Sequence, residues 1–182
     1  LKHAGRLNRL VEDLLTISKI ELGEVKINFE NTSLADALNN VLPLIEPKAK
    51  LKNIAITNLV GEKAPQIKAD KDRLAQIFVN VLDNAVKFTP ENGKVSVDAK
   101  EANGYIVTTI SDTGIGIPKE EIERLGERFY RVDKNRSREL GGTGLGLSIV
   151  KHLMIAHGGK MEITSQLGQG TKVALYFPLM KI

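Results

Sequence analysis

The 182-residue chain contains no cysteine. Without thiols it can form no disulfide framework, no Cys-ligated zinc or iron–sulfur site and no thiolate nucleophile. Because nothing in the composition argues for secretion, we expect a reducing, cytoplasmic setting. The 6 prolines and 16 glycines are scattered rather than periodic, which excludes collagen-like and low-complexity structure.

Long apolar runs and a strong charge of one sign are also missing. No run approaches the roughly 18 to 20 apolar residues that span a bilayer, and the start, LKHAG, is neither a signal peptide nor a natural methionine start. Twenty-six basic against 22 acidic residues leave a formal charge of +4, which is too mild to indicate nucleic acid as a partner. With 42% hydrophobic residues the chain can bury a core, and we expect a globular fragment of a longer protein.

The first 22 residues have the periodicity of an amphipathic helix. Apolar residues recur at helical spacing between polar ones, and Gly23 ends the pattern. A lone helix of this length cannot bury its own apolar stripe, so the stripe must pack either against the following domain or against a second copy of itself. The stripe comprises Leu7, Leu10, Val11, Leu14, Leu15 and Ile17.

The rest of the chain mixes helical and alternating segments. Helical periodicity predicts helices over about 33–52, 71–87 and 144–157. Alternation of apolar and polar residues predicts strands, several of them in hairpin-like pairs, so the sheet should be mixed and largely antiparallel. Together these elements predict an α+β fold, a two-layer α/β sandwich preceded by one amphipathic helix. The predicted strands are 25–30, 54–59, 94–100, 105–111, 160–165 and 172–177.

The helix predicted over 71–87 has two different faces. One face is apolar at i, i+3, i+4, i+7 and i+8, as in a core-facing helix. On the other face, Gln76, Asn80, Asn84 and Lys87 follow at steps of four, four and three residues. Solvated helix faces usually carry Glu and Lys, and Asn is a mediocre helix former. The stripe is therefore either an ordinary surface face or a row of polar groups that binds a ligand.

A glycine-containing segment, residues 111–118 (SDTGIGIP), follows a predicted strand. Its two glycines permit a close approach of the backbone, and Pro118 opens a short helix. The carboxylate of Asp112 either belongs to a capped turn or accepts a hydrogen bond from an amino group on a bound ring. The segment alone does not decide between these two interpretations.

A second glycine-rich segment, residues 141–148 (GGTGLGLS), runs directly into the last predicted helix. Glycine-rich backbone at a helix N-terminus presents unsatisfied N–H groups and the positive end of the helix dipole, which favour a phosphate group. The segment is not a Walker A loop, because no G-x-x-x-x-G-K-S/T sequence occurs in the chain. It also lacks the spacing and the preceding strand of a dinucleotide-binding G-x-G-x-x-G turn.

Between the two glycine segments, residues 128–138 hold five basic residues against one acid, Asp133. Several cations beside glycine-rich loops suit a polyphosphate, although a solvated basic loop explains any single one of them equally well. The polar and glycine residues that follow favour a mobile lid. The basic residues are Arg128, Arg131, Lys134, Arg136 and Arg138.

Four short motifs follow one another along the chain: 80–90 (NVLDNAVKFTP), 112–117 (DTGIGI), 129–131 (FYR) and 142–147 (GTGLGL). They closely resemble the asparagine, first glycine, phenylalanine and second glycine boxes of sensor histidine kinases. Each box alone is a weak indicator of the family, but four boxes in the same order are highly specific. The resemblance covers essentially the whole chain. It implies that residues 1–23 are part of the second helix of the dimerisation and phosphoacceptor hairpin. Residues 24–182 would then be the catalytic ATP-binding domain, a sandwich of the Bergerat type.

The resemblance also implies the cofactors, Mg²⁺ and ATP or ADP. It makes Asn84 the Mg²⁺ ligand, with Asn80 supporting the site. Magnesium prefers hard oxygen ligands and keeps several waters, so one carboxamide oxygen plus nucleotide phosphates is a sufficient set. Two cations are implied for catalysis: Lys87 would reach the phosphates, and Arg131 would approach the γ-phosphate.

For the nucleotide base, the resemblance implies two side chains. Phe88 would lie against the adenine, and Asp112 would accept a hydrogen bond from its amino group. Thr143 would assist through its hydroxyl group or a water molecule. The two glycine boxes contribute the remaining binding residues, which are Gly114, Gly116, Ile117, Gly142, Gly144, Leu145, Gly146 and Leu147.

One box of the family has no match in this chain. The phosphoacceptor box is a His followed by an acidic residue and Leu-Arg-Thr/Ser-Pro, whereas His3 is followed by Ala-Gly-Arg. His152 and His157 fall in or at the end of the last predicted helix, where we expect packed or surface histidines. The resemblance therefore implies that the accepting histidine lies on an upstream segment absent from this chain.

The implied function is that of an ATP-dependent protein-histidine kinase, which transfers the γ-phosphoryl group to that histidine for relay to a response regulator. The implied assembly is a homodimer through the hairpin, with membrane contact only through upstream segments. Two alternatives remain, an ATPase clamp related to gyrase and the heat-shock chaperones and a non-catalytic nucleotide-binding scaffold. The related ATPases place a glutamate, as base for water, where this chain has Asn80, and an amide cannot take that proton. Asp83 is acidic but lies about 100° around the helix from Asn84.

Overall fold

The structure is a computed structural model. It describes residues 2–24, 26–61, 64, 66–133 and 142–179, and in the first helix it describes the side chains of residues 7 and 10–20. Within these residues no helix is both long enough and apolar enough to cross a membrane.

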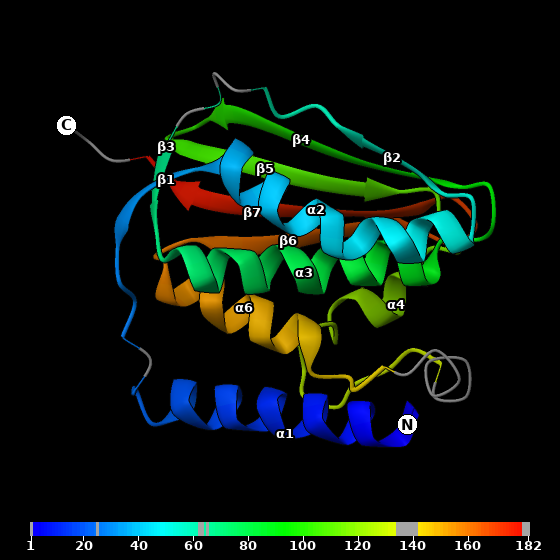
Figure 1. The fold of residues 1–182 in the computed structure, drawn as a ribbon, viewed down its shortest axis with the longest axis horizontal. Helices are drawn as coiled ribbons and strands as arrows, with labels where there is room; N and C mark the ends of the chain where they lie inside the picture. The colour runs from blue at the N-terminus through cyan, green and yellow to red at the C-terminus, as the bar shows by residue number, and fades with distance from the viewer. Residues whose placement is uncertain (1, 25, 62–63, 65, 134–141, 180–182) are drawn as a thin grey trace.

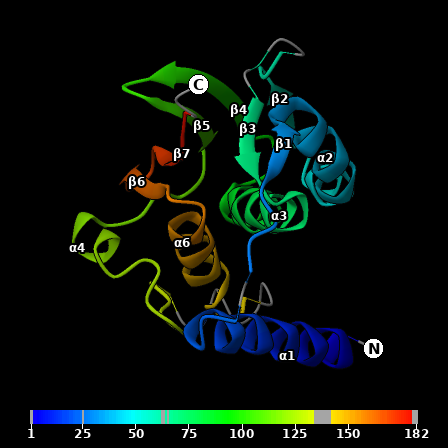
Figure 2. The ribbon, with the colours of Figure 1, turned by 90° about the vertical axis from the view of Figure 1, so that its left-hand side faces the viewer.

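One larger sheet has helices against one of its faces (Figures 1 and 2). Its strands are β2 (Ala55–Asn58), β4 (Lys94–Ala102), β5 (Tyr105–Asp112), β6 (Lys160–Gln166) and β7 (Gly170–Pro178). They lie in the order β2-β4-β5-β7-β6, with β2 parallel to β4 and all other neighbours antiparallel. The helices of the other layer are α2 (Leu34–Leu51), α3 (Lys71–Phe88) and α6 (Gly146–Ala156). This arrangement confirms the predicted two-layer α/β sandwich with a mixed, largely antiparallel sheet.

Side chains fix where α2 and α3 begin. Ser33 precedes α2, and its hydroxyl oxygen accepts a hydrogen bond from the N–H of Asp36 at 3.2 Å. Asp70 precedes α3 and accepts in the same way from the N–H groups of Asp72 and Arg73, both at 3.1 Å. Each bond satisfies N–H groups that have no partner inside the helix.

The apolar face of α3 forms the centre of the core. It packs toward the sheet and toward α6, and its large side chains are almost completely removed from solvent. The predicted helical periodicity is therefore confirmed as the periodicity of burial. The buried side chains of α3 are Leu74, Ile77, Phe78, Val81, Leu82, Ala85 and Val86.

The strand predicted at 25–30 is wrong. The structure instead has β1 (Glu30–Ser33), paired antiparallel with β3 (Gln66–Ala69) in a separate two-stranded sheet, and β3 was not predicted at all. The physical reason is that Phe29 packs edge-on against the ring of His157, with ring centroids 5.7 Å apart, instead of joining a ladder. Phe29, one of the alternating apolar residues, is thus used in an aromatic contact and not in strand pairing.

The first helix, α1 (Lys2–Glu21), lies beside α6 and the loop that precedes it (Figures 1 and 2). Ile17 is buried, and Leu10 and Ile20 pack partly against the core. The rest of the predicted stripe is 45–61% exposed, so this helix uses only one edge of its apolar surface on its own domain. The exposed members are Leu7, Val11, Leu14 and Leu15.

His157 connects the end of α6 to the start of α3, and it is a packed histidine as predicted. Its Nδ1 donates to the carbonyl oxygen of Leu153 at 2.7 Å, and its Nε2 accepts from the N–H of Asp70 at 3.2 Å. The ring also meets Phe177 edge-on. Burial lowers the pKa of His157 below its ordinary value of 6.5, although the bond to Leu153 and the charge of Asp70 oppose the shift.

We expect the free energy of unfolding to fall as the pH is lowered below about 6.5. In that window the unfolded chain binds a proton at His157 that the folded chain takes up only at lower pH, so stability rises with pH. Urea unfolding at several pH values between about 5.5 and 7.5 measures the slope of the free energy of unfolding against pH. His157→Gln should flatten the slope, whereas the control His152→Gln should keep it; equal slopes in both variants would contradict the assignment.

Candidate functional site

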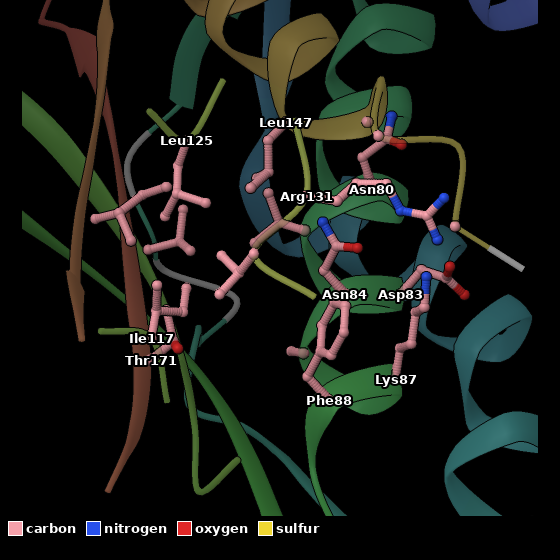
Figure 3. A pocket seen from close by; sticks show the side chains of 18 of the residues that line it. Asn80, Asp83, Asn84, Lys87, Phe88, Ile117, Leu125, Arg131, Leu147 and Thr171 are labelled. Carbon is pink, nitrogen blue, oxygen red and sulfur yellow. The ribbon is translucent and has the colours of Figure 1, made fainter. Parts of the chain in front are cut away.

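A cavity of about 220 Å³ opens between α3, the end of β5 and the start of α6 (Figure 3). Of the predicted site residues, only Gly114 and Leu145 do not line it: Leu145 is fully buried, and the N–H of Gly114 donates to Asp112. The fold thus brings together residues that the sequence separates widely. The predicted residues in the wall are Asn80, Asn84, Lys87, Phe88, Asp112, Gly116, Ile117, Arg131, Gly142, Thr143, Gly144, Gly146 and Leu147.

The polar stripe of α3 forms one wall, with Asn80, Asn84 and Lys87 along the helix (Figure 3). The amide nitrogen of Asn80 donates to the carbonyl oxygen of Gln76 at 2.9 Å, which fixes its orientation. A Cβ atom on Gly146 would lie 2.8 Å from the amide oxygen of Asn80, so α6 approaches α3 this closely only because residue 146 is a glycine.

Asp112 lines the cavity from the end of β5. Its Oδ1 accepts hydrogen bonds from the N–H groups of Gly114 at 2.8 Å and Thr171 at 3.2 Å. Burial raises the pKa of the Asp112 carboxyl, while these two hydrogen bonds act in the opposite direction. Both bonds use Oδ1, and within the described part of the chain no hydrogen bond reaches Oδ2. Oδ2 is therefore available as an acceptor for a ligand.

The first glycine segment ties this end of β5 to α3. The N–H of Ile115 donates to the carbonyl oxygen of Phe88 at 3.2 Å, so this glycine segment and the last residue of α3 are fixed to each other. Gly116 adopts φ +68°, and a Cβ atom there would lie 2.0 Å from the carbonyl oxygen of Gln166. A side chain at this position would collide with backbone, which explains the glycine.

The second glycine segment leads into α6 without a side-chain cap at its N-terminus. The helix therefore presents N–H groups and the positive end of its dipole at the cavity, as predicted. The N–H of Phe129 donates to the carbonyl oxygen of Gly144 at 3.0 Å, which attaches the phenylalanine box to this turn. Most of the predicted lid falls on residues 134–141, which lie outside the described residues. This range includes three of the five basic residues, Lys134, Arg136 and Arg138.

Two cations belong to the cavity wall. Arg131 lines it with Nε and Nη2 shielded from solvent, and the Nζ of Lys87 lies 5.1 Å from the ring centroid of Phe88. Among the described residues there is no group of three or more His, Cys, Asp or Glu side chains that would hold a metal ion. The two cations in the cavity wall suit an anionic ligand.

Four carboxylates that line the cavity were not predicted as site residues: Asp13, Asp83, Glu127 and Asp133. Asp83 lines the cavity beside Asn84 and forms an ion pair with Lys48 of α2. Asp13 reaches the cavity from α1 and accepts a hydrogen bond from the Thr143 hydroxyl at 3.0 Å. The sequence held no signal for Asp13, because 130 residues separate it from its partner.

A sequence comparison decides the family. The family described as "Histidine kinase-, DNA gyrase B-, and HSP90-like ATPase" matches residues 69–181, more than half of the chain. The chain belongs to this ATPase family.

Individual relatives confirm the resemblance to sensor histidine kinases. The sensor histidine kinase WalK of Bacillus subtilis is 36% identical over 175 residues, which are 95% of this chain and 28% of WalK. Full-length ShkA, solved in complex with AMPPNP, is 32% identical with a TM-score of 0.83 over 98% of this chain and 38% of ShkA. Histidine kinase ThkA, solved with the response regulator protein TrrA, shares the fold at 22% identity, with a TM-score of 0.73 over 96% of this chain and 49% of the ThkA chain. The chain spans less than half the length of each.

Lys52, just after α2, holds the end of α3 that carries the site. Its ammonium group donates to the carbonyl oxygens of Val86 at 2.8 Å, Lys87 at 3.0 Å and Thr89. A cation at a helix C-terminus also interacts favourably with the helix dipole. Lys52 therefore fixes the backbone from which Lys87 and Phe88 project into the cavity.

We expect Lys52→Met to lower the free energy of unfolding by about 1–3 kcal/mol, because it leaves the last carbonyl groups of α3 without their charged donor. The exposed Lys50, also at the end of α2, is the matched control, and Lys50→Met should change stability by less than about 0.5 kcal/mol. Urea unfolding monitored by circular dichroism measures both. Equal losses in the two variants would contradict this role of Lys52.

Proposed function

We propose that the chain is the ATP-binding catalytic part of a sensor histidine kinase. In this proposal residues 24–182 bind Mg·ATP or Mg·ADP, and residues 1–23 belong to the second helix of a dimerisation hairpin. The observation that carries it is the convergence on one cavity of a base-binding carboxylate, a carboxamide stripe and an uncapped, glycine-rich helix N-terminus. A nucleotide has the matching parts in the matching order, an amino-bearing ring and a chain of phosphates.

The adenine end of the proposed site is the more rigid one. Oδ2 of Asp112 would accept a hydrogen bond from the adenine amino group, since Oδ1 is already committed to two backbone N–H groups. The ring of Phe88 would lie against the base. Gly116 and Ile117 would complete the walls, and Gly114 would act behind them through its N–H bond to Asp112. Neighbouring atoms approach both glycines too closely to admit a side chain.

The phosphate end would lie between α3 and the Gly142–Gly146 turn. Asn84 would supply one hard oxygen ligand to Mg²⁺, supported by Asn80, and phosphate oxygens and waters would supply the rest. When bound, Mg²⁺ would neutralise part of the charge on the phosphates. Lys87 and Arg131 would bind the phosphate chain, together with the N–H groups of the turn, which includes Thr143, Gly144 and Leu145 and continues to Leu147.

The proposed reaction transfers the γ-phosphoryl group to a histidine on an upstream helix. The imidazole nitrogen forms the new bond to phosphorus as the bond to the bridging oxygen breaks, and ADP leaves. The domain would contribute position and charge stabilisation rather than covalent chemistry, with Arg131 and Lys87 near the charge that develops. Whole-protein partners would be a response regulator, as in the ThkA–TrrA complex, and a second copy of the hairpin against the exposed face of α1. Any membrane contact would come through upstream segments.

Two observations favour phosphoryl transfer over hydrolysis. The position of the hydrolase glutamate is Asn80, whose amide is committed to the Gln76 carbonyl group and cannot accept a proton from water. The acidic neighbour Asp83 lines the cavity, but its carboxylate is ion-paired with Lys48 and so is not held ready for water. An ATPase clamp would instead need a base that is held ready for water.

We expect Asp112→Asn to weaken ATP and ADP binding by about tenfold or more, because the amide can turn a donor toward the donor amino group of adenine. Isothermal titration calorimetry measures both affinities. The exposed Asp98 on β4 provides the matched control, and Asp98→Asn should leave binding unchanged. Unchanged affinity in Asp112→Asn would remove Asp112 from the base site.

We expect this chain to bind ATP without labelling itself, and to label a separately supplied histidine-bearing helical hairpin. Radiolabelled ATP and acid-lability of the product measure the transfer, and a hairpin with its histidine replaced by alanine is the control. Transfer should be slow, because the covalent tether and its effective concentration are missing. If the chain incubated with ATP alone carried acid-labile phosphate on His3, His152 or His157, the accepting histidine would lie in this chain and not on an upstream segment. Rapid phosphate release would move the chain to the hydrolase class.

A further inference from the structure

A carboxylate from outside the sandwich reaches the phosphate end of the cavity. Asp13, on α1, lines the cavity, and its Oδ2 accepts the hydrogen bond from the Thr143 hydroxyl at 3.0 Å. Thr143 lies in the turn directly before α6, whose N-terminus has no side-chain cap. An anion at this point is favoured by the helix dipole, so Asp13 stands where a phosphate oxygen is expected to bind.

The hydroxyl of Thr143 has only one hydrogen to donate. In this structure that hydrogen is directed to Asp13, while the oxygen accepts from the N–H of Leu145 at 3.2 Å. A phosphate oxygen that seeks the same hydrogen must replace the carboxylate. The two groups also carry charge of the same sign, and the repulsion grows with each phosphate that the ligand adds.

Among the described side chains of α1, only a small apolar surface is buried against the rest of the domain. Ile17 is the single apolar side chain of α1 that is fully buried among those described, with Leu10 and Ile20 only partly covered. A helix held by so little apolar surface can be displaced by a modest gain in ligand affinity. The contact between Asp13 and Thr143 is therefore well suited to couple the position of α1 to the ligand.

We propose that Asp13 discriminates between nucleotides: with α1 seated beside α6, its carboxylate disfavours ATP more than ADP. This inference rests on the proposed function, because that proposal puts the phosphates at the Gly142–Gly146 turn. By thermodynamic reciprocity, ATP binding moves α1 away from the cavity, and ADP does so less. The nucleotide with the transferable phosphoryl group thus releases the helix, and the product lets it return.

The first test compares affinities in two single variants. Asp13→Ala removes the charge and the acceptor, and we expect it to tighten ATP binding about five- to tenfold at low salt and ADP binding less than about twofold. Glu12→Gln is the matched control, since Glu12 is the exposed neighbouring acid on the same helix and should leave both affinities unchanged. Asp13→Asn removes only the charge, and it should also raise the affinity for ATP relative to that for ADP.

The second test follows the position of α1 directly. Because the chain has no cysteine, Lys19→Cys on α1 and Lys151→Cys on α6, both at exposed positions, create a unique pair for spin labels. We expect a non-hydrolysable ATP analogue to lengthen the distance between the labels and ADP to lengthen it less. In the Asp13→Ala background the distance should be long before any nucleotide is added.

The outcomes separate this inference from the proposed function. If the unchanged chain binds neither nucleotide, the proposed function fails. If it binds both, an equal change for ATP and ADP in Asp13→Ala overturns the inference alone. Weaker ATP binding in that variant also overturns it, because Asp13 would then hold the nucleotide rather than repel it. A label distance that stays constant with the ATP analogue bound overturns the coupling to α1.

Discussion

The two faces of α3 serve the core and the cavity at once, and this double use constrains the rest of the structure. The apolar face is buried among sheet and helix side chains, so the helix has little freedom to rotate or slide. Asp70 fixes its first turn, and Lys52 fixes its last. The carboxamides and Lys87 therefore project from a helix whose position is set by the core, as the proposed contacts with a metal ion and phosphates would require.

The two ends of the cavity are built from different kinds of group. At one end, Asp112 and the glycine segment are held by backbone hydrogen bonds and by contacts that exclude any side chain at Gly116. The other end combines a helix N-terminus with the flexible side chains of Lys87 and Arg131. In the proposed function, the rigid end would recognise one chemical group, whereas the long cations could follow a phosphoryl group as it moves from donor to acceptor.

Carboxylates at the phosphate end are each held by a partner. Asp83 is paired with Lys48, and Asp13 accepts from Thr143. In the proposed function, Asp83 would stand near the nucleotide as half of an ion pair with Lys48, whereas Asp13 would compete with a phosphate oxygen for the hydrogen of the Thr143 hydroxyl. Asp83 lies within the asparagine motif, but Asp13 lies outside all four motifs.

Local sequence determined much of this protein. The periodicity of 71–87 predicted both faces of α3, the hairpin turns predicted the antiparallel strands, and the four motifs predicted most of the cavity wall. These features depend on residues within one helix, one turn or one pair of neighbouring strands, so a short window of sequence contains them. The start of α6 was predicted two residues early, because Gly144 has φ +77° and cannot continue the helix.

Tertiary structure alone decided the rest. It paired β1 with β3, brought Lys52 to the end of α3, set Lys48 against Asp83 and carried Asp13 to Thr143. Each of these contacts joins residues more than thirty positions apart, and no local pattern in either segment indicates its partner. Their partners are chosen by how packed elements meet in space, and that choice depends on the whole core rather than on any local pattern.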